Sequence, residues 1–144
     1  MLLSQTAHYA LRAVYYLAST GDDRWLLVKD IAAATGIPAP YLARILSTLA
    51  KKGLLASRTG INGGFRVADS GTGHDLYDVV SQFDNLEGIS ACIFGFTKCC
   101  ENGKCSLHIP WCNLKAELVQ LLKSTSLGDL RTSFKKFDWS KLQF

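Results

Sequence analysis

Residues 37–53 read IPAPYLARILSTLAKKG, a stretch that predicts a helix with two unlike faces. Apolar side chains recur at helical spacing on one face, at Leu42, Ile45, Leu46 and Leu49. The opposite face carries small polar and basic groups and one aromatic ring, at Tyr41, Ala43, Arg44, Ser47, Thr48 and Lys51. Prolines suit the first turn, because the amide hydrogen that they lack would be unpaired there, and a glycine ends the helix. We therefore expect one buried face and one face that is free to contact another molecule.

Two further helices are predicted before this stretch. Apolar residues recur with helical periodicity over residues 4–19, and residues 30–35 form a short helix that Gly36 closes in a left-handed conformation. The apolar run at residues 24–28 is expected to be a brief strand. A tight turn then leads into the third helix.

A hairpin is predicted directly after the third helix. Residues 54–57 and 65–67 flank a turn with three glycines and an asparagine, which supply the unusual backbone angles of such a turn. The order helix, turn, helix and basic hairpin predicts a winged helix in residues 1–70. The expected fold class is mainly α with a small β-hairpin (α+β): a winged helix-turn-helix domain followed by a long C-terminal dimerisation helix.

The positive charge of the chain is concentrated in its first half. The net charge is +4, and residues 1–70 hold 8 Lys/Arg against 4 Asp/Glu, whereas residues 71–144 hold 8 of each. Residues 31–68 contain five cations and no acid. This charge pattern is typical of a surface that binds a polyanion such as DNA.

Size and composition exclude several classes of protein. A chain of 144 residues, 48% hydrophobic and 19% charged, has room for one compact domain or a small domain with an appendage. It holds no apolar run of the roughly 18 residues that a membrane span needs, and its start lacks signal-peptide features, so we expect a cytoplasmic protein. No P-loop, dinucleotide fingerprint or Ser/His/Asp order indicates catalysis, so we do not expect an enzyme.

The second half is predicted to contain a sensor loop and a dimerisation helix. Residues 75–83 favour a short helix, residues 86–112 a loop and residues 113–123 a helix. Four leucines share one side of that last helix: Leu114, Leu118, Leu121 and Leu122. We expect the same helix of a second subunit to cover them, with burial inside the monomer as the alternative. Residues 71–130 would then form this unit, and residues 131–144 a C-terminal tail.

All five cysteines lie within 21 residues, at Cys92, Cys99, Cys100, Cys105 and Cys112. An odd, clustered set in a cytoplasmic chain favours metal or redox chemistry over a framework of disulfides. A cytoplasmic location and this clustering together predict a sensor or a metal site.

Short motifs are spread over the chain: TAHYALRA at 6–13, DIA at 30–32, GIP at 36–38, YLARIL at 41–46, GLL at 53–55, GGFR at 63–66, CSLH at 105–108 with Trp111, and SLGDL at 126–130. Together they resemble the IscR/NsrR-type (Rrf-two) family of winged-helix bacterial transcriptional regulators. The resemblance implies a homodimeric DNA-binding regulator with a palindromic operator and a long helix that forms the dimer. In many members an iron–sulfur cluster senses iron, nitric oxide or redox state, and we expect a repressor.

The resemblance also implies a set of metal ligands. Cys92, Cys99 and Cys105 match the family's spacing of three thiolates, and soft thiolates suit iron–sulfur coordination. His108 is favoured as fourth ligand, because Cys105 and His108 repeat the arrangement of a family member with a three-cysteine, one-histidine [2Fe-2S] site. We therefore favour [2Fe-2S] over [4Fe-4S].

Two rivals for the fourth ligand and one rival function remain open. Cys112 shares a face with His108 if both are helical, and His8 occupies a first-helix position that family members use across the dimer. The rival function is a cluster-free thiol sensor, in which Cys99 or Cys100 oxidises, or a structural zinc site built from the same ligands.

We expect seven residues to contact DNA: Tyr41, Arg44, Ser47, Lys51, Lys52, Arg58 and Arg66. Arg44 is the best candidate for reading base edges in the major groove. Lys51 and Lys52, at the helix end, are expected to contact phosphates. Arg58, at the hairpin tip, is expected to enter the minor groove.

Overall fold

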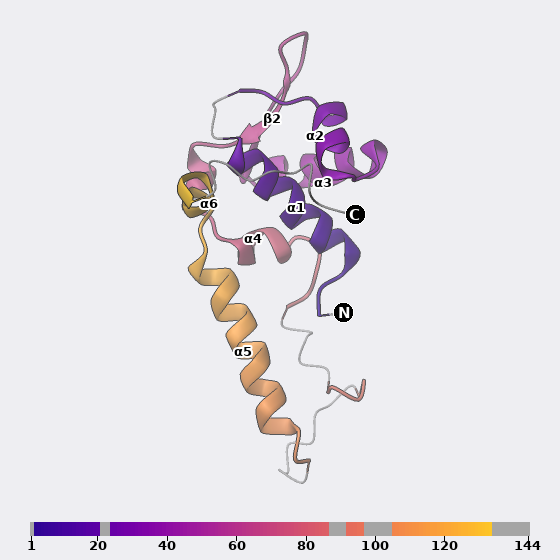
Figure 1. The fold of residues 1–144 in the computed structure, drawn as a ribbon, viewed down its shortest axis with the longest axis vertical. Helices are drawn as coiled ribbons and strands as arrows, with labels where there is room; N and C mark the ends of the chain where they lie inside the picture. The colour runs from indigo at the N-terminus through magenta and orange to yellow at the C-terminus, as the bar shows by residue number, and fades with distance from the viewer. Residues whose placement is uncertain (1, 21–23, 87–91, 97–104, 134–144) are drawn as a thin grey trace.

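The computed structural model describes residues 2–20, 24–86, 92–96 and 105–133. The helices are α1 (Gln5–Ser19), α2 (Val28–Thr35), α3 (Ala39–Lys51), the 3-10 helix η1 (Ser70–Gly73), α4 (Leu76–Val80), α5 (His108–Ser124) and α6 (Leu127–Ser133). The strands β1 (Leu55–Arg58) and β2 (Gly64–Val67) pair as an antiparallel hairpin, which we call the wing. Figure 1 shows the wing at one end of the molecule and α5 extending away from the other helices toward the opposite end. The mainly helical α+β fold class is confirmed.

Helix α1 is the central element of the packing. It begins where the Ser4 hydroxyl accepts a hydrogen bond from the Ala7 amide at 3.1 Å, a normal helix N-cap. Its buried face is built largely from alanines, and Ala7, Ala10 and Ala13 are fully buried. Ala10 and Ala13 belong to the main core with α3 and α6, whereas Ala7 belongs to a second, smaller core. Both cores therefore rest on α1.

Helices α2 and α3 form the expected helix-turn-helix. Gly36 ends α2 with a φ of 71°, and its amide bonds to the Ala32 carbonyl at 2.9 Å. The apolar stripe of α3 is buried, as its periodicity predicts. However, α2 begins at Val28, so the strand expected over residues 24–28 was wrong. Leu26 alone makes a single β-bridge, to Phe65 of the wing.

That bridge attaches the wing to the segment before α2. The Leu26 amide donates to the Phe65 carbonyl at 3.0 Å, and the Phe65 amide donates to the Leu26 carbonyl at 2.8 Å. Gly64 permits this approach: its φ is 136°, and a Cβ atom there would lie 2.2 Å from the Leu26 carbonyl oxygen. Only glycine combines that backbone angle with so little space.

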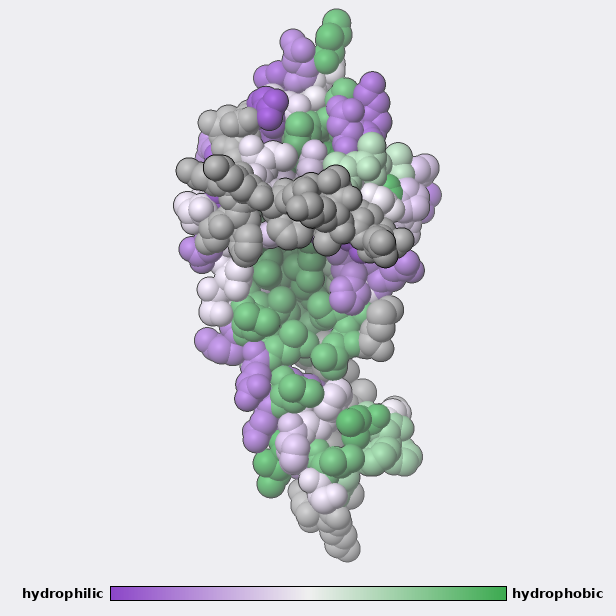
Figure 2. Space-filling model, viewed as in Figure 1, coloured by the Kyte–Doolittle hydropathy of each residue, from purple (hydrophilic) through white to green (hydrophobic). Residues whose placement is uncertain are grey.

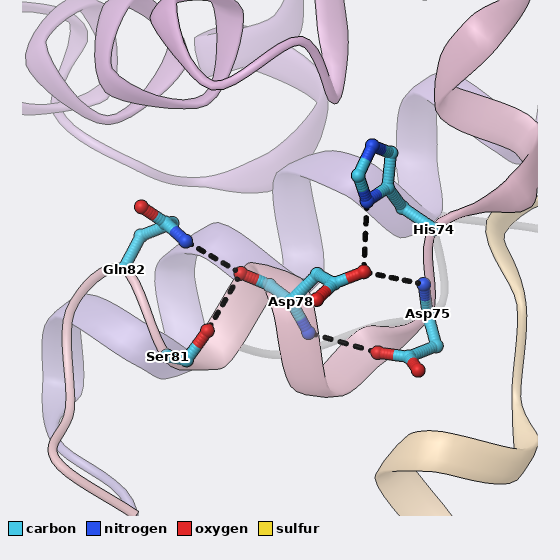
Figure 3. Close-up of polar contacts among 5 residues, drawn as sticks. All are labelled: His74, Asp75, Asp78, Ser81 and Gln82. Carbon is cyan, nitrogen blue, oxygen red and sulfur yellow. Dashed lines mark hydrogen bonds and ion pairs between the residues drawn. The ribbon is translucent and has the colours of Figure 1, made fainter.

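Helix α4 is shorter than predicted, and a capping box begins it. The Asp78 amide donates to the Asp75 carboxylate at 2.9 Å, and the Asp75 amide donates to the Asp78 carboxylate at 3.3 Å. His74 Nδ1 also lies 2.8 Å from that Asp78 carboxylate, while Ser81 and Gln82 donate to the Asp78 carbonyl (Figure 3). These contacts hold the chain rigidly where it leaves the winged helix.

Helix α5 is longer than predicted, and α6 returns to the main core. The structure starts α5 at His108, five residues before the expected start, because Pro110 lies in the first turn, where proline is tolerated. After α5 the chain turns back, and Leu127 and Leu130 of α6 are buried in the same core as α1 and α3. Leu127 and Leu130 therefore contribute to the core of the winged helix.

Replacing Gly64 by alanine is expected to loosen the wing. The strained backbone angle alone costs about 1–3 kcal/mol, and the new Cβ would collide with the Leu26 carbonyl. Gly73→Ala is the matched control, because a Cβ there meets no atom within 4 Å. Urea unfolding should show a lower free energy of unfolding for Gly64→Ala only. Equal stabilities for the two variants would contradict the tie between wing and Leu26.

Candidate nucleic-acid interface and thiol site

The outer face of α3 carries exposed basic and polar side chains. Arg44, Ser47 and Lys51 are exposed on this helix, and Lys52 is exposed at its C-cap. The leucine and isoleucine stripe behind them is buried, so the orientation of this face is set by the core. Four of the seven expected DNA contacts therefore lie together on one accessible surface.

Tyr41 differs from these four because it is attached to α1. Its hydroxyl hydrogen-bonds to the Thr6 hydroxyl, and its ring packs edge-on against Tyr9 with ring centres 5.6 Å apart. The Arg12 guanidinium lies over the Tyr9 ring, with its central carbon 5.4 Å from the ring centre. The start of α3 is thereby pinned to α1, and Tyr41 remains 39% exposed.

Arg58 is exposed, and its side chain makes contacts within the wing and with Trp25. It lies at the end of β1, and its Nε and Nη2 atoms donate to the Asn62 carbonyl at 3.1 and 2.6 Å. Its guanidinium carbon also lies 4.9 Å from the ring centre of Trp25. Arg66 of β2 is half-buried and lies 4.7 Å from the same ring centre. Both wing arginines are therefore held by neighbours within the protein.

Two residues at this end escaped the sequence analysis. Trp25 was included only in an apolar run, and no pattern in the sequence pairs it with the wing. Ile61 was treated as part of the turn, yet it is 99% exposed, which places an apolar side chain at the tip of the wing. Its position inside a glycine-rich turn could have indicated that Ile61 is exposed at the tip. Figure 2 shows hydrophilic residues gathered at the wing end and an apolar area over the middle of the same face.

The start of α5, which carries His108 and Cys112, lies at the end of the molecule opposite the wing (Figure 1). His108 is in the first turn of α5, its amide bonds to the Cys105 carbonyl at 3.1 Å, and the Cys112 sulfur lies 3.9 Å from His108 Nε2. Cys92 is buried in a short turn, where the Gly95 amide donates to its carbonyl at 2.7 Å.

The described part of the chain contains only some of the predicted donors. Cys99 and Cys100 lie outside the described residues, and His8 is exposed on α1. Within the described ranges, no group of three or more potential ligands is close enough to hold a metal ion. Two side chains at the start of α5 do lie close together, the Cys112 thiol and the His108 imidazole, and both are of the kind that soft metals prefer.

The four leucines of α5 do not share one environment. Leu122 is buried within the chain in the second core, with Ala7, Val80 and Leu86, which for this residue matches the alternative of burial inside the monomer. Leu118 is partly buried against the same core, whereas Leu114 and Leu121 are 49% and 60% exposed. The exposed side forms an open groove of about 390 Å³, lined by Leu2, Leu114, Lys115, Glu117, Leu118 and Leu121.

Residues 3–133 match the Rrf2 family, described as an iron-dependent transcriptional regulator. The chain belongs to this family. The resemblance seen in the sequence motifs is thereby confirmed, and the chain is a DNA-binding transcriptional regulator rather than an enzyme. Among the helices of the described ranges, none combines the length and apolar character that a membrane span requires.

Relatives of this Rrf2 chain include several transcriptional regulators. It is 33% identical to a putative HTH-type transcriptional regulator of Aquifex aeolicus over 90% of the chain and 91% of that protein. It is 28% identical to the HTH-type transcriptional regulator IscR of Photobacterium profundum, over 90% of this chain and 75% of that protein. Its fold is similar to that of T. potens IscR (22% identity, TM-score 0.68, 99% and 92% covered). Its fold is also similar to that of CymR, the global cysteine regulator of B. subtilis. The identity is 22% and the TM-score 0.71, and the match covers 90% of this chain and 95% of CymR.

Proposed function

We propose that this protein is a homodimeric repressor whose binding to a palindromic operator is controlled by an iron–sulfur cluster. The observation that carries the proposal is the separation of two surfaces in one packed fold. The exposed basic face of α3 and the wing lie at one end, and the start of α5, with His108 and Cys112, lies at the other. α5 and α1 join the two ends through a shared core.

DNA binding is assigned to α3 and the wing. A helix fits the width of the major groove, and Arg44 has the exposure and the bidentate donors to read a guanine edge. Lys51 and Lys52 extend from the end of the same helix and are suited to phosphates. Arg58 and Arg66 bring two cations to the wing, beside the adjacent backbone or minor groove.

Dimerisation is assigned to the groove on α5. Leu114 and Leu121 are large apolar residues that the monomer leaves exposed. Covering them with the same helix of a second subunit would remove apolar surface from water and place two α3 helices on one duplex. Two-fold symmetry of the protein then requires a palindromic operator.

The cluster is assigned to Cys92, Cys99, Cys105 and His108. Bound there, an iron–sulfur cluster supplies one-electron redox chemistry and a target for nitric oxide. The turn that begins α5 joins Cys105 and His108 through a backbone hydrogen bond, and Cys92 is itself buried within an otherwise exposed turn. A cluster spanning these segments would tie the loop to the start of α5. Cys112 and His8 remain the alternatives to His108, and [2Fe-2S] remains the favoured type.

A cluster-free thiol sensor is the second candidate, and one contact favours it. The Cys112 sulfur lies 3.9 Å from an imidazole nitrogen of His108, so one thiol of the cysteine-rich segment has a polar partner within the chain. CymR from Staphylococcus aureus, whose oxidised form has been solved, is similar in fold (19% identity, TM-score 0.70). A structural zinc ion on the same ligands is the third possibility.

The visible spectrum of protein purified without oxygen distinguishes these candidates. The unmodified protein should be coloured, and Cys92→Ala, Cys99→Ala and Cys105→Ala should each abolish the visible absorption. Cys100→Ala is the matched control and should retain it. Iron and sulfide assays should follow the colour. A colourless protein that contains zinc would contradict the cluster, and loss of colour in Cys100→Ala but not in Cys99→Ala would shift the ligand assignment by one residue.

Salt-dependent DNA titrations test the two arginine assignments. Arg58→Ala should flatten the slope of log affinity against log salt by about 2 in a dimer, because each phosphate contact contributes roughly 0.9. Arg44→Ala should cost about 1–3 kcal/mol per lost base contact on a selected operator and much less on scrambled duplex. Lys123→Ala, a cation on α5, is the control. If both arginine variants bind both duplexes like the unmodified protein, DNA does not bind this surface.

Sedimentation equilibrium tests the dimer interface. Leu121→Glu should yield a folded monomer with weakened operator binding, because Leu121 is exposed in the monomer and a charge would be buried only in the dimer. Gln120→Glu adds the same charge at a neighbouring exposed position and should remain dimeric. A Leu121→Glu protein that still sediments as a dimer would exclude the α5 groove as the interface.

A further inference from the structure

Trp25 lies in contact with both arginines of the wing. The guanidinium carbons of Arg58 and Arg66 lie 4.9 and 4.7 Å from the centre of its indole ring. These distances are within the range of attractive cation–π contacts, for which tryptophan is the strongest aromatic partner. One half-buried ring therefore touches a side chain from each strand of the hairpin.

The backbone around Trp25 is attached to the same hairpin. Leu26, the next residue, makes two hydrogen bonds with Phe65, and Gly64 allows the chains to approach. The indole ring is consequently carried by a segment that cannot shift relative to β2 without breaking those bonds. Trp25 has a set position from which to hold the arginines.

Arg58 is also held from the other side of the turn. Its Nε and Nη2 atoms share the Asn62 carbonyl at 3.1 and 2.6 Å. The turn from Arg58 to Asn62 is thereby closed by a side chain that itself rests on Trp25. This arrangement also determines where the exposed Ile61 is presented at the wing tip.

We propose that Trp25 is a positioning residue for DNA binding, whose indole ring presents the guanidinium groups of Arg58 and Arg66 to the duplex in one arrangement. The proposal rests on the proposed DNA-binding function of the wing. Long arginine side chains lose rotamer freedom when they bind, and holding them beforehand reduces that loss. Trp25 itself need not touch DNA.

A mutant cycle on a selected operator duplex, read by fluorescence anisotropy, tests the proposal. Trp25→Leu keeps an apolar side chain but removes the π-system, and it should weaken binding by about 10- to 100-fold for a dimer with two wings. Trp25→Phe keeps a ring and should restore most of the affinity. Leu27→Ala, an apolar truncation in the same segment at a side chain that is 37% exposed, is the control and should bind normally.

The decisive comparison uses the Arg58→Ala/Arg66→Ala background. In it, Trp25→Leu should cause no further loss, because the groups that Trp25 positions are gone. An equal loss in both backgrounds would overturn the proposal and assign Trp25 to a direct DNA contact or to folding.

Full binding by Trp25→Leu, with weak binding by the double arginine variant, would also overturn the proposal while leaving the proposed function intact. Full binding by the double arginine variant would instead refute the proposed role of the wing. Circular dichroism of each variant confirms that the fold is retained.

Discussion

The pair of backbone hydrogen bonds between Leu26 and Phe65 is the contact on which the DNA-binding end depends. A two-stranded hairpin is at best marginally stable by itself, and this bridge attaches the wing to the segment that leads into α2. Gly64 makes this close approach possible. Because Trp25 directly precedes Leu26, the same bridge places the Trp25 ring beside the wing arginines. The positions of the wing and of the helix-turn-helix are therefore set by one another.

Helix α1 extends this constraint through the rest of the molecule. One part of its buried face packs in the main core with α3, and Ala7 packs in the second core with Leu122 of α5. The Thr6–Tyr41 hydrogen bond adds a polar link between α1 and the start of the helix assigned to the major groove. The C-terminal part of α5, through Leu122, is thus packed into the same framework as α1 and α3.

Much of the fold was predictable from local sequence rules, and the errors came from tertiary contacts. Helical periodicity gave α1 and α3, Gly36 gave the end of α2, and the glycine-rich turn gave the wing. Spacing alone did not reveal that Leu122 faces the chain's own core, because one side of a helix can be divided between two neighbours. Arg58 and Trp25 illustrate the same limit. Their contact joins residues far apart in the sequence, and composition carries no signal for it.

Hydrogen–deuterium exchange of the protein with and without a selected operator tests the central assignment most directly. The account predicts slower amide exchange on DNA binding within α3 and across residues 58–66 of the wing, where the exposed basic side chains lie. Exchange within the second half of α5 should be the same with and without DNA, since that helix is assigned to the dimer. Protection concentrated in α5, with α3 and the wing unchanged, would contradict the account.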